Sequence, residues 1–267
     1  MSHRGSVKTG QPLVPRKIRK WDLFRVFLRS FFVQSVWNYR SLISIGFGIC
    51  LFPILKRLYP DARSRKEFLL RHLKFFNAHP YMVSYALGVS IRLEEEYASG
   101  NLQDTDRLDR LKDLLISILG SLGDQIFWLT LRPVSLLVGA FGVFVAGSVE
   151  QQVAVLILTF LLYNIPHLYL RYVGILEGYR YGMEIYRCFQ EGRFERLKKG
   201  YLYLGVAIFF LFLGVLFVQL KAEHWVWIPV IGGAAIYASI FYKFSKNFYF
   251  TCLFTILFFV IVGFIFL

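Results

Sequence analysis

Six polar or aromatic side chains in the middle of the chain could together hold a small ligand that carries many hydroxyl groups and no charge. Recognition of such a ligand, a sugar for example, needs amide, imidazole and carboxylate groups for paired hydrogen bonds and an aromatic face for the ring. The residues of these types that we predict to bind substrate are Asn77, His79, Glu94, Glu95, Asp124 and Trp128.

Asp124 is the strongest single candidate, because it lies in a largely apolar segment. A carboxylate near a bilayer is costly unless it faces a cavity or a partner. Gly120 and Gly123 allow close approach of the backbone, and the break in a helix that they favour would suit a discontinuous helix lining a binding site. The alternative is that Asp124 caps a helix that begins after it, and the two roles are compatible.

Two other candidate segments also have a structural interpretation. Residues 77–80 are a helix-stop signal, since Pro80 disfavours helical backbone at His79. A plain turn explains this segment as well as ligand contact does. The acidic run 94–96 fits a solvated helix end, and this is the favoured interpretation for Glu96.

The large side chains near the membrane segments have open alternatives as well. Trp128 fits core packing or an interface anchor equally well. Arg132 either pairs with Asp124, about two helical turns away, or extends its charge to the membrane interface. The aromatic runs 209–217 and 248–266 are typical of a lipid-facing surface.

The chain has no arrangement typical of a self-sufficient enzyme. No histidine lies in a hydrolase or kinase pattern, and no glycine-rich loop followed by lysine is available for a phosphate; the histidines are His3, His72, His79, His167 and His224. The cysteines are far apart and lack the spacing of metal ligands: Cys50, Cys188 and Cys252. We therefore expect no catalytic residue, no metal site and no cofactor.

The elements that must position these residues are membrane helices. The 267 residues are 56% hydrophobic and only 18% charged, against roughly 25% charged in an average soluble domain. Uncharged runs cover 201–220, 224–242 and 247–267, and a further pair covers 133–149 and 151–170. About 20 apolar residues cross a bilayer as a helix, the backbone form that hydrocarbon requires. The predicted class is all-α, a polytopic integral membrane protein with re-entrant or broken helices.

The distribution of charge predicts the topology. The first 40 residues hold nine Lys or Arg and one acid, Asp22, and residues 171–200 hold seven Lys or Arg. Both segments are expected to be cytoplasmic by the positive-inside rule. The N-terminus is then cytoplasmic, and residues 133–170 enter and leave from the same side, with Glu150 near the far turn.

The basic segment 56–74 holds seven Lys or Arg in 19 residues. The favoured interpretation is a cytoplasmic loop facing anionic lipid, and the alternative is a docking surface for a negatively charged protein. Binding to nucleic acid is not expected, because no nucleic-acid fold signature accompanies the charge. The net charge of +14 therefore indicates topology.

The N-terminal region contains an amphipathic helix. Residues 21–32 place one stripe of apolar side chains opposite Arg25 and Arg29; the stripe is Phe24, Phe27, Leu28, Phe31 and Phe32. The helix either lies in the membrane interface or packs on the protein's own core. The predicted organisation is a basic arm at 1–32, a motif region with membrane-embedded helices at 33–200, and transmembrane helices at 201–267.

Four ordered motifs carry a resemblance to a known family. They are Trp-Asn-Tyr at 37–39, Phe-Phe-Asn-x-His-Pro at 75–80, Leu-Gly-Val at 87–89 with Leu-Glu-Glu at 93–95, and Gly-x-x-Gly-Asp-x-x-Phe-Trp-x-Thr-Leu-Arg-Pro at 120–133. With a weaker echo at 163–182, the chain resembles the IID component of the mannose/fructose/sorbose family of bacterial phosphotransferase systems. The motif residues with an expected structural role are Asn38, Gly88, Gly120, Gly123, Arg132 and Pro133.

The resemblance implies a membrane subunit that does not catalyse by itself. A IID component pairs with a IIC component in the bacterial cytoplasmic (inner) membrane, and together they form the path for a hexose, as a trimer of IIC–IID pairs. The phosphoryl group passes through histidines of IIA and IIB to the sugar, so IID carries no phosphohistidine. Residues 56–74 are then a candidate docking surface for IIB.

Two segments depart from the family pattern. Residues 117–124 keep the Gly-Asp pair and lack the usual Gly-Pro, and residues 163–167 read Tyr-Asn-Ile-Pro-His where Trp-Asn followed by arginine is usual. These departures leave open an alternative function: a non-transporting structural or regulatory protein that assembles with a IIC-like partner.

Overall fold

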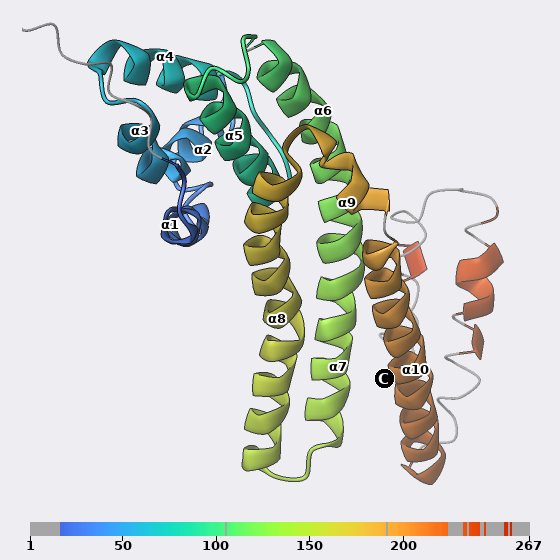
Figure 1. Cartoon of the computed structure of the whole chain (residues 1–267). Coiled ribbons are helices and arrows are strands. Elements are labelled where there is room, and N and C mark those ends of the chain that lie inside the picture. The colour runs from blue at the N-terminus through green and yellow to red at the C-terminus, as the bar shows by residue number, and fades with distance from the viewer. Residues whose placement is uncertain are drawn as a thin grey trace, which may run out of the picture. The chain divides into compact units, whose positions relative to one another are not determined.

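The computed structural model describes residues 17–104, 106–190 and 192–223, together with 232–233, 235–240, 243, 254–255 and 257. The chain divides into two compact units, Met1–Gly205 and Val206–Leu267. Within the described residues the regular structure is helical, apart from isolated β-bridges that join Asn38 to Leu42 and Leu42 to Phe76 (Figure 1). The predicted all-α class is confirmed.

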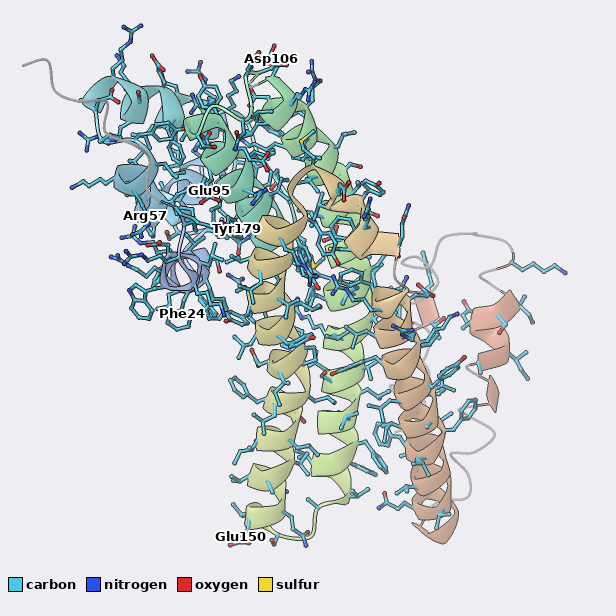
Figure 2. All side chains as sticks on the ribbon, in the orientation of Figure 1. Phe24, Arg57, Glu95, Asp106, Glu150 and Tyr179 are labelled. Carbon is cyan, nitrogen blue, oxygen red and sulfur yellow. The ribbon has the colours of Figure 1, made fainter. Side chains whose placement is uncertain are left out.

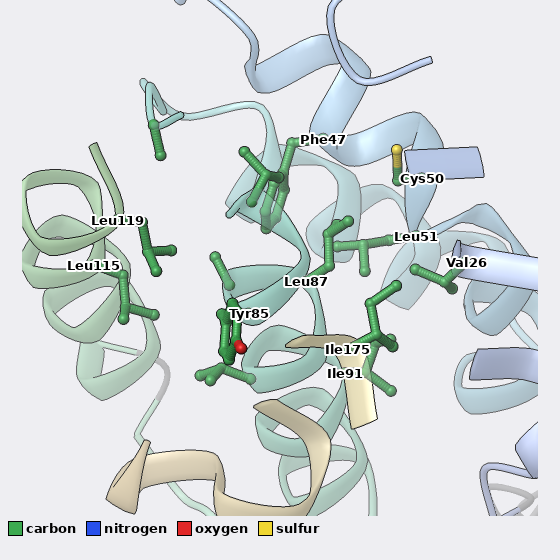
Figure 3. Close-up of a cluster of buried hydrophobic side chains, with 14 of the residues drawn as sticks. Val26, Phe47, Cys50, Leu51, Tyr85, Leu87, Ile91, Leu115, Leu119 and Ile175 are labelled. Atoms are coloured by element: carbon green, nitrogen blue, oxygen red, sulfur yellow. The ribbon is translucent and has the colours of Figure 1, made fainter. Parts of the chain in front are cut away.

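Residues 17–104 form a helical head in the first unit. Its helices are α1 (Lys20–Ser30), α2 (Ser44–Cys50), α3 (Phe52–Leu58), α4 (Ala62–His72) and α5 (Val83–Ala98). Helix α5 lies at the centre, because most of its residues between Val83 and Glu94 are buried. Phe47 and Leu51 are among the core side chains around it, and Leu87 is one of its own (Figure 3).

Helix α1 uses two faces. Leu23 and Val26 are buried against the head, whereas Trp21 and Phe32 are 62% and 64% exposed. Asp22 is also buried, and its carboxylate pairs with Arg57 at 3.1 Å. The helix therefore packs on the protein's own core through a stripe other than the predicted phenylalanine stripe, which leaves several aromatic rings at the surface. The predicted amphipathic N-terminal helix is confirmed.

Two long antiparallel helical segments follow the head (Figure 1). The first joins α6 (Asp106–Gly123), a π-helix η1 (Asp124–Leu131) and α7 (Arg132–Val145) without interruption, and we call it the α6–α7 rod. The second is α8 (Val149–Tyr181). Ser148 caps α8 by accepting a hydrogen bond from the Gln151 backbone N–H at 3.4 Å. Glu150 lies at the turn, as expected from the sequence (Figure 2).

Three further named helices follow α8. They are η2 (Gly182–Glu184), α9 (Tyr186–Gln190) and α10 (Arg193–Glu223), which includes the boundary between the two units. Within the first unit, Arg193 pairs with Glu177 of α8 and donates to the Tyr85 hydroxyl at 3.3 Å. Tyr201 donates to the Leu162 carbonyl at 2.5 Å. These contacts fix the start of α10 against α8.

Among the described residues, three helical segments are long and apolar enough to cross a membrane: Asp106–Val145, Val149–Glu184 and Tyr186–Leu216. They contain the predicted run 151–170 and most of the runs 133–149 and 201–220. The run 133–149 looks short in the sequence because it is the last part of the longer α6–α7 rod. Of the predicted run 224–242 the structure describes 232–233 and 235–240, which are helical, and of the run 247–267 it describes 254–255 and 257.

Glycines allow α5 and α8 to cross in close contact. A Cβ atom on Gly88 would lie 2.3 Å from the Ile175 carbonyl oxygen, and one on Gly178 would lie 2.3 Å from the Tyr85 carbonyl oxygen. Neither position has space for a side chain, because real Cβ atoms do not approach backbone this closely. The Leu-Gly-Val motif and the Gly178 of the weaker echo therefore form one helix crossing.

Candidate functional site

Two of the sequence motifs meet at His79. A Cβ atom on Gly123 would lie 2.2 Å from the His79 Cβ, so the loop 73–82 can approach the α6–α7 rod only because residue 123 is glycine. The His79 ring stacks on Phe127, with ring centroids 5.1 Å apart and 13° between the planes. It also meets the edge of Trp128 at 6.0 Å. The structure thus brings His79, Asp124 and Trp128 into one region.

The rod changes helix type within the Gly-Asp motif. Residues Asp124–Leu131 form the π-helix η1, and the Thr130 hydroxyl donates to the Gln125 carbonyl at 2.7 Å across this wider turn. Single π-helical turns inside α-helices are rare and often occur at functional sites. They also relax the backbone in front of Pro133, which lacks an N–H and whose ring would crowd the preceding turn. The break expected from the glycines is a change of helix type, with no gap in the helix.

Asp124 does not act as a helix cap. Gly123 before it has helical φ and ψ angles, and the helix continues through Asp124 into η1. The capping alternative is therefore wrong. Asp124 is exposed on the rod, and no Asp124–Arg132 ion pair occurs among the described residues.

Asn77 and Trp128 are also exposed, and Trp128 has 56% of its surface accessible. Asn77 lies two residues before His79 in the same loop. Three of the predicted site residues therefore present polar or aromatic groups at the surface beside buried His79. A carboxylate on a helix capable of crossing a membrane needs a partner or an aqueous cavity, so this region is suited to contact with another molecule.

His79 itself is neutral and buried. Burial lowers the pKa of His79 to about 4, and the nearby Arg171 charge acts in the same direction. Its Nε2 atom has no hydrogen-bond partner among the described residues. The segment 77–80 is a turn between α4 and α5, as one interpretation of the sequence expected.

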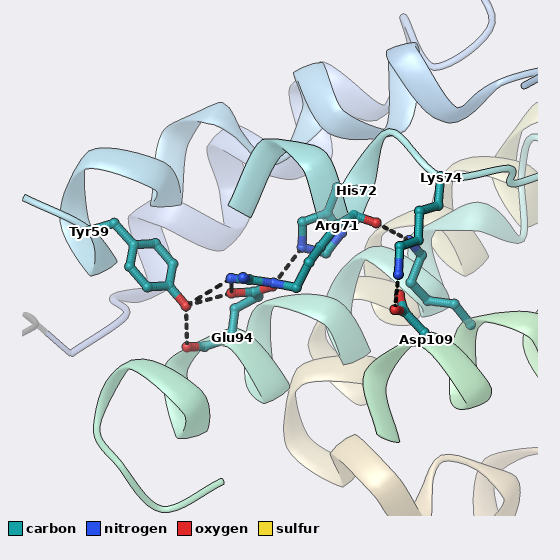
Figure 4. Close-up of polar contacts among 7 residues, drawn as sticks. Tyr59, Arg71, His72, Lys74, Glu94 and Asp109 are labelled. Atoms are coloured by element: carbon teal, nitrogen blue, oxygen red, sulfur yellow. Dashed lines mark hydrogen bonds and ion pairs between the residues drawn. The ribbon is translucent and has the colours of Figure 1, made fainter. Parts of the chain in front are cut away.

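Glu94 lies elsewhere, in a buried polar cluster of the head (Figure 4). Its Oε2 accepts hydrogen bonds from Tyr59 at 2.5 Å and Arg71 at 2.8 Å, and its Oε1 lies 3.0 Å from both Arg71 Nε and His72 Nε2. Both oxygens are occupied and the residue has no accessible surface. This environment favours a structural role over the predicted contact with a sugar.

The charge state of this cluster follows from its geometry. Burial raises the pKa of Glu94, but hydrogen bonds from His72 and Arg71 outweigh it and hold the pKa at about 2. Burial lowers the pKa of His72, and its contact with Glu94 acts in the opposite direction. Lys112 of α6 donates to the Arg71 carbonyl at 3.2 Å and so connects the rod to the head.

Glu95 connects the start of the head to the end of α8. Its Oε1 accepts from the Ile18 backbone N–H at 2.7 Å, and its Oε2 accepts from the Tyr179 hydroxyl at 2.6 Å. Glu96 pairs with Arg92 on the same helix at 2.6 Å. These acids lie near the C-terminal end of α5, whereas His79 lies in the loop before its N-terminal end. The structure therefore does not bring Glu94 and Glu95 together with Asp124.

Asn38 has the structural character expected of a motif residue, whereas Gly120 does not. The Asn38 Oδ1 accepts from the Ser41 backbone N–H at 2.9 Å and thereby closes a turn in which Leu42 has a φ of 54°. A Cβ atom on Gly120 would meet nothing within 4 Å. The requirement for glycine is therefore steric at Gly123 and not at Gly120.

A cavity of about 430 Å³ lies beside His79, between the rod and α8. Its lining residues come from the loop 73–82, η1, α7 and α8 and are Tyr81, Trp128, Arg132, Ser135, Leu136, Thr159, Phe160, Tyr163 and Asn164. Sequence reasoning assigned no role to most of these residues. The signal that it missed is the presence of hydroxyl and amide side chains inside the uncharged runs 133–149 and 151–170.

Arg171 is a further residue that sequence reasoning left without a role. It is 3% exposed, and it donates to the Ser30 carbonyl at 2.5 Å and to the Pro80 carbonyl at 3.2 Å. Its guanidinium also lies over the Phe31 ring at 4.7 Å. Arg171 thus ties the end of α1 and the loop after His79 to α8, and it positions the loop that lines the cavity.

Among the described residues no group of three or more His, Cys, Asp or Glu side chains is arranged to hold a metal ion. The site is accordingly built from an exposed carboxylate, amide groups, hydroxyl groups and aromatic rings. These groups are suited to hydrogen bonding with a polar, uncharged molecule.

Comparison with known proteins identifies the family. A family model for the PTS system mannose/fructose/sorbose family IID component matches residues 17–223. The chain is 36% identical over 203 residues to the PTS system mannose-specific EIID component of Escherichia coli (strain K12), an alignment that covers 76% of this chain and 70% of that relative. It is 32% identical over 193 residues to the Fructose permease IID component of Bacillus subtilis (strain 168), covering 72% and 68%.

Solved structures agree with this relationship. One chain of a membrane protein superposes with a TM-score of 0.63 at 34% identity, covering 73% of this chain and 70% of that one. A chain of the mannose transporter ManYZ in complex with microcin E492 superposes with a TM-score of 0.58 at 28% identity, covering 93% and 96%. The chain belongs to the IID component family of the mannose/fructose/sorbose phosphotransferase systems and is a helical membrane subunit of a sugar permease of that type.

Proposed function

We propose that this chain forms, together with a IIC partner, the path by which a hexose crosses the bacterial cytoplasmic membrane. IIB phosphorylates the arriving sugar with a phosphoryl group received from IIA, and phosphorylation prevents return. The chain itself performs no catalytic step. The family match over residues 17–223 is the observation that carries this proposal.

The exposed group Asn77, Asp124 and Trp128 is proposed to face the sugar path. Asp124 and Trp128 belong to the π-helix of a rod that is long and apolar enough to cross a membrane. Their exposure is costly in lipid but is explained if the IIC partner and hydrated sugar cover them. Trimeric assembly of IIC–IID pairs remains part of the proposal.

The orientation is proposed from the charges. Arg132 and Arg171 flank the uncharged runs of the antiparallel pair at the same end, and Glu150 lies at the other end. With the basic head in the cytoplasm, the pair enters the membrane from the cytoplasmic side and turns at Glu150. The N-terminus is then cytoplasmic.

The basic surface of α4 is proposed to face the cytoplasm and bind either anionic lipid or IIB. Its Arg63 side chain is 91% exposed and pairs only with Glu67 on the same helix among the described residues. Attraction of a phosphorylated protein or of a lipid headgroup requires charge of this sign and accessibility.

Uptake of radiolabelled mannose, fructose and sorbose tests the proposal. Cells carrying the cognate IIC, IIB and IIA proteins are compared with and without this chain, and deletion is expected to abolish uptake of at least one sugar.

Asp124→Asn is expected to lower uptake at least tenfold, whereas Asp113→Asn on the exposed side of the same rod serves as the matched control. Unchanged uptake on deletion would overturn the function, and unchanged uptake in Asp124→Asn would remove that residue from the path. Co-purification with IIC without any uptake would favour a structural or regulatory role.

A further inference from the structure

The cavity between the rod and α8 has a lining that is unusual for a membrane helix pair. Seven of its nine lining residues carry a hydrogen-bonding side chain, and two, Leu136 and Phe160, do not. The same two helices elsewhere expose leucine, isoleucine, valine and phenylalanine, as lipid-facing surfaces do. Polar groups in this concentration at a membrane helix pair indicate contact with a polar ligand, since hydrocarbon offers them no hydrogen bonds.

Ser135 shows that the protein itself does not provide a hydrogen-bond partner for every polar group in the lining. The residue is 2% exposed, lines the cavity, and its Oγ has no hydrogen-bond partner among the described residues. A buried hydroxyl without a partner is energetically unfavourable. A ligand hydroxyl seated in the cavity would satisfy it.

Asn164 and Tyr163 offer complementary groups from the facing helix. The Asn164 amide N–H donates to the Phe160 carbonyl at 2.8 Å, which fixes the side chain and leaves its Oδ1 as an acceptor. The Tyr163 hydroxyl lies 3.4 Å from the Tyr81 hydroxyl. The cavity therefore presents hydroxyl groups that both donate and accept, beside an amide acceptor.

The charge and shape of the cavity restrict the class of ligand. None of the described residues that line it is acidic, so a cation has no counter-charge there. Arg132 is its single basic residue, whereas a phosphate site commonly combines several cationic or backbone N–H donors. Trp128 and Tyr81 supply aromatic surface, and a volume of about 430 Å³ lies within the range of small-molecule sites.

We propose that this cavity is a subsite for an uncharged monosaccharide ring, bound by hydrogen bonds from Ser135 and Asn164 against the Trp128 face. The inference rests on the proposed function and deepens it, because it names residues outside the predicted site. Arg132 donates to ring hydroxyls from the rim, where the uncharged run of the rod begins.

Protection of an introduced cysteine tests the subsite directly. Asn164→Cys and Leu161→Cys are placed in a chain whose native cysteines are replaced by serine, and each is assembled with the IIC partner in membranes. A membrane-permeant maleimide then reports the accessibility of the cysteine. Leu161 is a suitable control because it is 42% exposed on the same helix and does not line the cavity.

The expected result is that D-mannose, D-fructose or L-sorbose slows labelling of the residue-164 cysteine at least threefold and leaves the residue-161 cysteine unchanged. Equal rates with and without all three sugars would overturn the inference. Protection by vesicles rich in phosphatidylglycerol, without protection by any sugar, would overturn it in favour of a lipid site.

Uptake kinetics separate this inference from the proposed function. Ser135→Ala is expected to raise the apparent KM for the transported sugar about tenfold, the equivalent of one lost hydrogen bond, with Ser117→Ala on the exposed side of α6 as the control. An unchanged KM in Ser135→Ala with normal wild-type uptake would count against the subsite and leave the function intact. Sugar protection at residue 164 without uptake by the wild-type complex would support the subsite and refute transport.

Discussion

The pairing of Gly123 with His79 is the clearest case in which a single residue type positions the site. The glycine and the histidine belong to two motifs that are far apart in sequence, and each motif alone suggested only a turn or a helix break. Their contact explains both at once, because the His79 ring fills the space that a side chain at 123 would need.

Gly123→Ala is expected to lower sugar uptake at least tenfold and to reduce stability by about 1–3 kcal/mol, because the added methyl group must displace His79 or the loop. Thermal unfolding in detergent and radiolabelled uptake measure the two effects. Gly120→Ala is the matched control, since it gains the same helix propensity and meets nothing within 4 Å. Equal effects of the two substitutions would refute the steric explanation.

The ionised cluster around Glu94 is predicted to make stability depend on acid pH. The pKa of Glu94 is depressed to about 2 in the folded protein, so its stabilising contribution is complete above the ordinary carboxyl pKa of about 4.3 and is lost as the pH falls from there toward 2. Thermal unfolding between pH 5 and pH 2 should therefore show a loss of stability.

Glu94→Gln should remove this pH dependence and cost about 3 kcal/mol at neutral pH, because Arg71 is left buried without its counter-charge. Glu67→Gln is the control, since Glu67 forms an exposed pair with Arg63 and exposed pairs contribute about 0–1 kcal/mol. A steep acid transition that persists in Glu94→Gln would assign the effect to other carboxylates.

At the scale of helices, the apolar runs predicted the membrane segments well, because length and the absence of charge are local properties of the sequence. The π-helix η1 could not be predicted in this way. Its hydrogen-bond pattern depends on the approach of the loop 73–82 and on Pro133, and neither effect appears as a hydrophobic period. The same reason explains why the glycines suggested a break where the structure has a continuous rod.

The orientation of α1 was only partly predictable. Its phenylalanine stripe is the most conspicuous apolar feature, yet the buried stripe contains Leu23, Val26 and Asp22. Burial of Asp22 depends on Arg57, which lies in another helix. A tertiary ion pair of this kind has no local sequence signal, so periodicity selected the other face.

The crossing of α5 and α8 is predicted to depend on Gly88. In Gly88→Ala the new methyl group would lie 2.3 Å from the Ile175 carbonyl oxygen, and forcing the helices apart should cost about 1–3 kcal/mol. The expected readout is a lower unfolding temperature and reduced recovery of folded protein. Gly200→Ala is the control, because it changes the same residue type in a helix and meets nothing within 4 Å. An unfolding temperature for Gly88→Ala as high as that of the control would contradict the close crossing.

At the scale of the whole molecule, the sequence indicated basic segments and apolar membrane helices. The first unit of the structure shows how the basic head is joined to the rod and to α8. The four motifs do not form one contiguous site. They build the α5–α8 crossing, the turn at Asn38, and the contact between the loop 73–82 and the rod. Family motifs were informative about membership, whereas the cavity residues Ser135 and Asn164 required the spatial arrangement of two helices.

The proposed topology predicts opposite accessibility for the two ends of the antiparallel pair. A cysteine at Gly147, in the turn between α7 and α8, should react with a membrane-impermeant maleimide added to intact spheroplasts. A cysteine at Asn101, in the head, should react only after the membrane is opened. Labelling of Asn101→Cys in intact spheroplasts would reverse the orientation, and failure of Gly147→Cys to react before opening would indicate a pair that does not reach the far side.

The part of helix α8 before Pro166 is long, and its length has a mechanical consequence. Its buried residues all lie after Pro166, from His167 to Gly178, where the helix is clamped against the head. The 17 residues from Val149 to Ile165 extend beyond that clamp for about 25 Å, at about 1.5 Å per residue. This segment packs against α7 at Gly139 and Gly142, and it ends at a proline, a common point of helix bending. A bend of about 10° at Pro166 would swing the turn at Glu150 by about 4 Å, given that length, while the clamped half and the Arg171 anchor stay in place.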